Sequence, residues 1–145
     1  MNEGTIRAIS ISERRGELKS EVPEARLLRD HGLEGDAHAG AWGRQVTCLD
    51  WASVEKANAE HAFHAGPGDF AENILVEGLD LSSVAVGSEL RLGKSAVLEV
   101  TQKGKEDLPS VVTEKFGMSL LPGEGLFCKV VEGGLIRKGD PVELI

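Results

Sequence analysis

The chain has 145 residues, and its 24 acidic residues outnumber its 16 lysines and arginines to give a net charge of −8. This length suits a single core, and we expect one domain over residues 1–145. The acidic balance argues against binding to nucleic acid or to an anionic membrane, because both require a basic face. No apolar run is long enough to span a membrane, and residues 1–4 lack the plan of a secretory signal, so we expect a cytoplasmic protein.

The composition favours a β-rich domain over a helical bundle. Eighteen glycines with no tyrosine and four phenylalanines indicate many turns between short strands. Both cysteines, Cys48 and Cys128, stand in apolar runs. In a reducing compartment we expect them to be buried thiols rather than a disulfide.

The first half of the chain alternates strand patterns with long polar stretches. Residues 5–12 are β-branched and partly alternating, which predicts a strand, and residues 24–30 suggest a helical turn. The glycine-rich residues 31–40 indicate a shaped loop. Residues 44–49 predict a second strand, with Val46 and Cys48 on one face. Asp50 is placed to cap a helix over residues 51–61.

The second half predicts mostly strands. A turn and strand are expected over residues 69–76, and residues 89–92 and 96–100 form a strand pair. A helix is predicted over residues 109–116 with Gly117 at its exit, followed by a turn at 121–125. Residues 126–131 and 135–137 indicate a hairpin, and residues 142–145 close the sheet. The result is a mainly β domain with two short helices.

The loop that follows residues 96–100 is the first candidate site. It contains Lys103, Lys105, Glu106 and Asp107 around Gly104. Charged residues just past a strand are typical of a site, although a solvated turn explains them as well. Lys103 and Lys105 alternate, so they share a face if the strand continues, where they would suit a phosphate or another oxyanion. Asp107 could pair with Lys105 or cap the helix after Pro109.

Several segments resemble, in their order along the chain, the MOSC domain, the module at the C-terminal end of molybdenum cofactor sulfurases that also occurs alone in bacteria. The matching segments are GLEGDAHAG (32–40), RQV (44–46), GDFAENI (68–74), VG (86–87) with LG (92–93), TQKGKE (101–106), PGEGLF (122–127), and GG (133–134) with KGD (138–140). The small bacterial stand-alone members are the most similar. The resemblance implies a MOSC-like β-barrel with a few short helices.

The sequence departs from the family pattern in the central loop. In these members the central loop resembles GKEC followed by histidine, whereas this chain has Asp107 and then Leu108 and Pro109. In the family that cysteine is the expected sulfur carrier or metal ligand, so its replacement argues against sulfurtransferase chemistry. A carboxylate still suits molybdenum or tungsten, which accept oxygen ligands, and the resemblance therefore implies Asp107 as the metal ligand.

The resemblance adds three residues to a cofactor site. His38 matches the family's Gly-Asp-x-His segment, although alone it would be a surface or turn histidine. Arg44 opens a strand and offers a planar fork for a phosphate or a pterin edge, where the alternative is a solvated charge. Asn73 could read a pterin edge through its amide or bind its own backbone. With Lys103 and Lys105 these residues form the predicted cofactor site.

Two functions follow from the resemblance. The first is a module that binds a metal-bound pyranopterin, the molybdenum or tungsten cofactor, for carriage, storage or delivery to a recipient molybdo- or tungsto-enzyme. The alternative is an enzyme, either a reductase of N-hydroxylated compounds supplied with electrons by a partner or a sulfurtransferase in cofactor maturation. A degenerate pocket with only a structural role is the third reading. Carriage is favoured because Asp107 replaces the cysteine.

Overall fold

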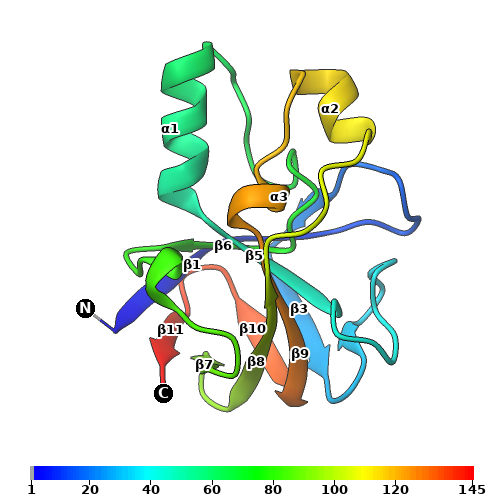
Figure 1. The fold of residues 1–145 in the computed structure, drawn as a ribbon. Coiled ribbons are helices and arrows are strands. Elements are labelled where there is room, and N and C mark those ends of the chain that lie inside the picture. Colours follow the sequence, from blue (N-terminus) through cyan, green and yellow to red (C-terminus); the bar gives the residue numbers. More distant parts are fainter. Residues whose placement is uncertain (1) are drawn as a thin grey trace.

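Seven strands close into a barrel in the computed structural model, which describes residues 2–145; Met1, where the predicted domain begins, lies outside the described residues (Figure 1). The strand order is β11-β7-β8-β9-β5-β6-β1, and pairing of β1 with β11 closes the circle. The strands are β1 (Glu3–Ile11), β5 (Val46–Asp50), β6 (Ile74–Glu77), β7 (Glu89–Leu92), β8 (Ala96–Lys103), β9 (Leu126–Glu132) and β11 (Pro141–Leu144). The predicted mainly β fold, with a barrel, is confirmed.

A second, three-stranded sheet stands beside the barrel, and it corrects two predictions. It consists of β10 (Gly134–Arg137), β3 (Glu24–Leu28) and β4 (Gly32–Leu33), while β2 (Ser20–Val22) pairs antiparallel with the end of β1. The helical turn predicted over residues 24–30 is wrong, because β3 pairs with β10 and β4 and buries Leu27 completely.

The hairpin predicted between residues 126–131 and 135–137 is also wrong. Strand β9 already pairs with β8 on one edge and with β5 on the other, so no edge remains for β10. At Gly133 a Cβ atom would lie 2.6 Å from the carbonyl oxygen of Leu27. The turn therefore packs directly against β3 and leads β10 into the second sheet.

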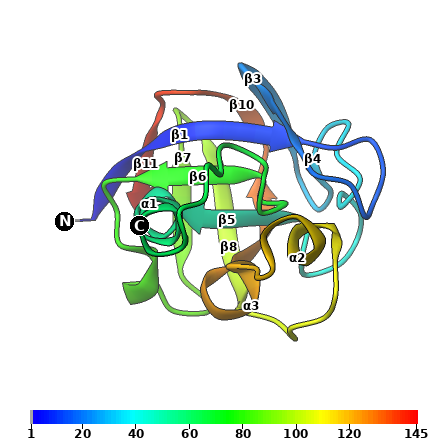
Figure 2. The same cartoon turned by 90° about the horizontal axis from the view of Figure 1, so that it is seen from above.

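Apolar side chains fill two regions that are separated by the barrel wall. Val46 and Cys48 lie in the barrel core, whereas Leu49 and Phe70 belong to a cluster beneath the helices. The helices α1 (Trp51–His61), α2 (Val111–Phe116) and α3 (Leu121–Glu124) gather on one side of the barrel (Figure 1), and η1 (Leu81–Ser83) is a short 3-10 turn. Seen from above, α2 and α3 are neighbours and α1 stands apart from them (Figure 2).

The helix ends follow the capping chemistry of the sequence. The Asp50 carboxylate accepts from the N–H of Ala52 at 3.0 Å, as predicted, and α1 ends at His61. Ser110 rather than Asp107 caps α2, and Gly117 ends it in the left-handed conformation. The predicted turn at 121–125 contains α3, with proline in the first helical turn. None of the helices within residues 2–145 has the length and apolarity needed to cross a membrane.

Candidate functional site

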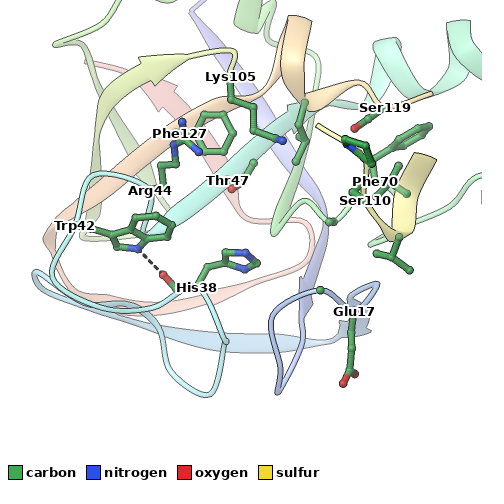
Figure 3. A pocket seen from close by; sticks show the side chains of 16 residues that line it. Glu17, His38, Trp42, Arg44, Thr47, Phe70, Lys105, Ser110, Ser119 and Phe127 are labelled. Carbon is green, nitrogen blue, oxygen red and sulfur yellow. Dashed lines mark hydrogen bonds between the residues drawn. The ribbon is translucent and has the colours of Figure 1, made fainter. Parts of the chain in front are cut away.

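A cavity of about 330 Å³ lies where the loop before β5 meets the segment between β8 and β9 (Figure 3). Four nitrogen-bearing side chains line it: His38, Trp42, Arg44 and Lys105. The rest of the lining is mostly apolar, with hydroxyl groups interspersed. The apolar side chains include Phe70, Val112, Leu121 and Phe127, and the hydroxyl groups come from Thr47, Ser110 and Ser119. The cavity is therefore amphipathic, with nitrogen groups on one side and apolar walls on the other.

Arg44 is held at the wall by three interactions. Its guanidinium lies 5.2 Å from the centre of the Phe127 ring and donates to both carboxylate oxygens of Glu106, at 3.1 and 3.3 Å. Its Nε donates to Gln102 at 3.3 Å. The hydrogen bond from Arg44 lowers the pKa of Glu106 to about 2. Since the Glu106 side chain is 53% exposed, an anionic ligand can replace it at little cost.

His38 lies against a buried ion pair. The Lys19 ammonium and the Asp36 carboxylate are 2.7 Å apart and nearly inaccessible to solvent. Lys19 Nζ is also 3.0 Å from His38 Nδ1. Burial and the charge of Lys19 lower the pKa of His38, with a smaller lowering by Arg15 and an opposing effect of Asp36. Asp36 also accepts from the backbone N–H groups of Ser12 and His38, so it braces the loop that carries His38.

Asn73 and Asp107, which were also predicted for the site, lie away from the cavity. Asn73 is buried, and its amide binds the backbone N–H of Thr47 and the carbonyl of Ser10, each at 3.0 Å, so it positions Thr47 instead of lining the cavity. Asp107 is exposed and contributes nothing to the lining. Within residues 2–145 no group of three or more histidine, cysteine or acidic side chains is arranged to hold a metal ion.

Lys103 faces a different cavity, because the strand does not continue to Lys105, which was the condition for the two lysines to share a face. Strand β8 ends at Lys103, and Gly104 turns the chain with φ of +71°. Lys103 Nζ donates to the carbonyl of Ser82 at 2.8 Å and lines a cavity of about 450 Å³ near the start of α1. Of the two lysines, only Lys105 belongs with Arg44.

Comparison with known proteins gives the family. The family model for the MOSC domain matches residues 35–143, which is most of the chain. The chain belongs to the MOSC domain family. This family is associated with the molybdenum cofactor. A search of curated proteins found no match.

Solved structures share the MOSC fold of this chain. YuaD from Bacillus subtilis has a TM-score of 0.77 at 17% identity, covering 98% of this chain and 95% of its own. YiiM from Geobacillus stearothermophilus has a TM-score of 0.76 at 18% identity, covering 98% and 75%. YiiM from Escherichia coli has a TM-score of 0.70 at 22% identity, covering 97% and 69%. At these identities the likeness supports the fold alone.

The two thiols of this MOSC domain are not available to the cavity. Cys48 and Cys128 are free and fully buried in the barrel core. A hydrogen bond with Cys48 and burial raise the pKa of Cys128 well above its usual value. The predicted burial of both thiols is confirmed, and Cys128 is unsuited to replace the cysteine missing from the central loop, because a protonated, enclosed thiol is a poor nucleophile.

Sequence reasoning missed four contributors to the site. Lys19 lies in a polar stretch without any motif, so nothing marked it as buried. Phe127 lies in the Gly-Leu-Phe segment quoted for the family, and its position beside a cationic residue was not predicted. Ser110 and Ser119 flank α2, and nothing in the sequence indicated that either serine lines a cavity; Ser110 caps the helix.

Proposed function

We propose that this MOSC domain binds a metal-bound pyranopterin, the molybdenum or tungsten cofactor or a late precursor, in the 330 Å³ cavity. Its role is carriage, storage or delivery to a recipient enzyme. The observation that carries the proposal is the convergence of Arg44 and Lys105 on an otherwise apolar cavity in a chain of net charge −8. Local positive charge in an acidic protein favours an anionic ligand at that place.

The lining fits the organic part of this cofactor. Arg44 suits the phosphate because its planar fork donates two hydrogen bonds, and Lys105 adds a second positive charge. The flat apolar walls of Phe70 and Phe127 suit a ring system. His38 and the hydroxyl groups are available to its polar edges. The cavity volume lies at the lower end of the range for small-molecule sites.

The lining supports binding more than chemistry at a metal. It contains no cysteine, and its one carboxylate, Glu17, is exposed at the edge, where it points away from Arg44 and Lys105 (Figure 3). When bound, the cofactor would supply oxo-transfer chemistry at its metal. The residues of this chain bind its anionic group and exclude water from its ring. Asp107 would need movement of the loop 104–110 to reach it, so its predicted role as a metal ligand stays a prediction.

The test is cofactor retention by protein produced in a host that makes the cofactor. Molybdenum and tungsten would be measured by elemental analysis, and the pterin by fluorescence after oxidative release. We expect near-stoichiometric metal and pterin in the wild type and much less of both in Arg44→Gln and in Lys105→Gln. Each substitution removes a charge-assisted hydrogen bond, which corresponds to about a tenfold or greater loss of affinity.

Lys103→Gln is the matched control. It removes the same charge two residues before Lys105, but the Lys103 side chain lines the other cavity. It should retain the cofactor like the wild type. Wild-type protein that stays empty while the host makes cofactor would refute the proposal, and so would equal losses in the two lysine variants.

A further inference from the structure

Lys19 is the most deeply buried cation of the described residues, and its contacts use all of its hydrogens. Its side chain is 1% exposed. The ammonium lies 3.2 Å from Ser12 Oγ, 2.7 Å from Asp36 Oδ1 and 3.0 Å from His38 Nδ1. An ammonium has three hydrogens to donate and no lone pair to accept with. Each of the three contacts therefore requires an acceptor on the other side.

This requirement determines the state of His38. Since Nδ1 must accept from Lys19, it carries a lone pair, and the neutral imidazole has its hydrogen on Nε2. Protonation of Nδ1 would place an N–H against the ammonium with no acceptor between them. The Lys19 ammonium pairs with the buried carboxylate of Asp36 at 2.7 Å, and its two remaining hydrogens are directed at Ser12 Oγ and His38 Nδ1.

The other groups around His38 fix its position without competing for Nδ1. Its backbone N–H donates to Asp36 Oδ2 at 3.2 Å, and its carbonyl accepts from Trp42 Nε1 at 2.7 Å, the bond drawn in Figure 3. The rings of His38 and Trp42 are nearly parallel, with centres 6.5 Å apart. Arg15 lies over the Trp42 ring, 4.8 Å from its centre. Burial, Lys19 and Arg15 lower the pKa of His38, in agreement with the neutral state.

We propose that Lys19 is a positioning residue that holds His38 as the neutral Nε2–H tautomer. His38 lines the cavity, so its Nε2–H is then a hydrogen-bond donor available to a ligand. A donor selects ligands that present an oxygen acceptor, such as an oxyanion or a carbonyl oxygen, and disfavours a bound metal ion, which needs the Nε2 lone pair. The inference rests on the proposed function only for the identity of that acceptor, since the tautomer follows from the ligand-free protein.

The test is a long-range proton–nitrogen correlation spectrum of protein labelled with ¹⁵N-histidine, recorded without ligand from about pH 8 down to about pH 5.5. We expect neutral His38 to show one tautomer, with unprotonated Nδ1 and protonated Nε2, and to become protonated only at a lower pH than in the unfolded protein. The same protein unfolded in urea supplies the reference for a free imidazole. A hydrogen on Nδ1 of the neutral ring, or protonation of His38 in the folded protein at the same pH as in the unfolded protein or a higher one, would overturn the inference.

Two further measurements separate positioning from mere packing. Inorganic phosphate should shift the His38 Nε2–H signal, whereas Zn²⁺ should leave it unchanged; a Zn²⁺-dependent change at Nε2 would overturn the donor role. Lys19→Met should let both tautomers and the protonated form appear near pH 6, and an unchanged single tautomer in that variant would refute a role for Lys19. If Lys19→Met does not fold, the wild-type spectrum still decides. An empty cofactor site would leave these results intact, so the two proposals fail separately.

Discussion

Replacing Gly68 by alanine tests whether the 68–73 segment supports the site through Lys19. Gly68 has φ of +82°, which favours glycine, and a Cβ atom there would lie 2.6 Å from the carbonyl carbon of Lys19. Real Cβ contacts do not come that close, so the Lys19 backbone must move. That movement stretches the bond from Lys19 N–H to the Gly68 carbonyl, now 3.2 Å, and disturbs the ion pair with Asp36.

The magnitude follows from these terms. An alanine in the left-handed region costs about 1–2 kcal/mol. Loss of the backbone hydrogen bond adds about 1 kcal/mol, and displacement of a buried ion pair adds up to about 3 kcal/mol. We therefore expect Gly68→Ala to lower the free energy of unfolding by about 2–6 kcal/mol in total.

Gly87→Ala is the matched control, because Gly87 has φ of +92° but nothing within 4 Å of the added Cβ atom. It should lose only the conformational term of about 1–2 kcal/mol. Urea unfolding measures both, and a difference of about 2 kcal/mol separates the midpoints by roughly 1 M. Equal losses in the two variants would refute the claim that the Gly68 turn supports Lys19 by direct contact.

Three further predictions follow from buried and exposed side chains. Burial raises the pKa of Glu72 from 4.5 to about 7, so the native chain keeps a proton that the unfolded chain has lost. The free energy of unfolding should thus fall as pH rises through that interval, by at most about 1.4 kcal/mol per unit, a slope that Glu72→Gln should remove in urea titrations. Cys48 and Cys128 should resist a thiol reagent until the protein unfolds; fast labelling of native protein would contradict their enclosure. Asp107→Ala should retain the pterin, which the cavity residues hold; loss of metal with the pterin retained would establish Asp107 as a ligand, whereas wild-type amounts of both metal and pterin would refute that role.

Much of the fold was predictable because barrel strands carry local patterns. The alternating residues of β7 and β8 and the closing role of β11 were predicted, as was the Asp50 cap of α1. The wrong predictions concern segments whose secondary structure is determined by contacts with distant strands. Residues 24–28 contain good helix formers, but burial of Leu27 between β10 and β4 makes them a strand.

The candidate site was predictable only in part. His38, Arg44 and Lys105 were expected and do meet at one cavity. Lys103 was not separable from Lys105 by alternation, because a single left-handed glycine between them redirects the chain. Lys19 carried no signal at all, since lysines are rarely buried and its partners lie 7 to 19 residues away in sequence.

Asp36 and Glu72, acidic residues of two segments that resemble the family, bind the backbone and do not line the cavity. Glu72 accepts from the N–H groups of Gly68 and Phe70, at 2.6 and 3.1 Å, and thereby fixes the turn against which Lys19 packs. Asp36 fixes the loop of His38 in the same way and binds the Lys19 ammonium. Two motifs more than thirty residues apart thus converge on one unmarked lysine. Lys19 and Asp36 hold the His38 imidazole at the cavity, so substitutions in either motif should change the His38 tautomer more than they change the cavity walls.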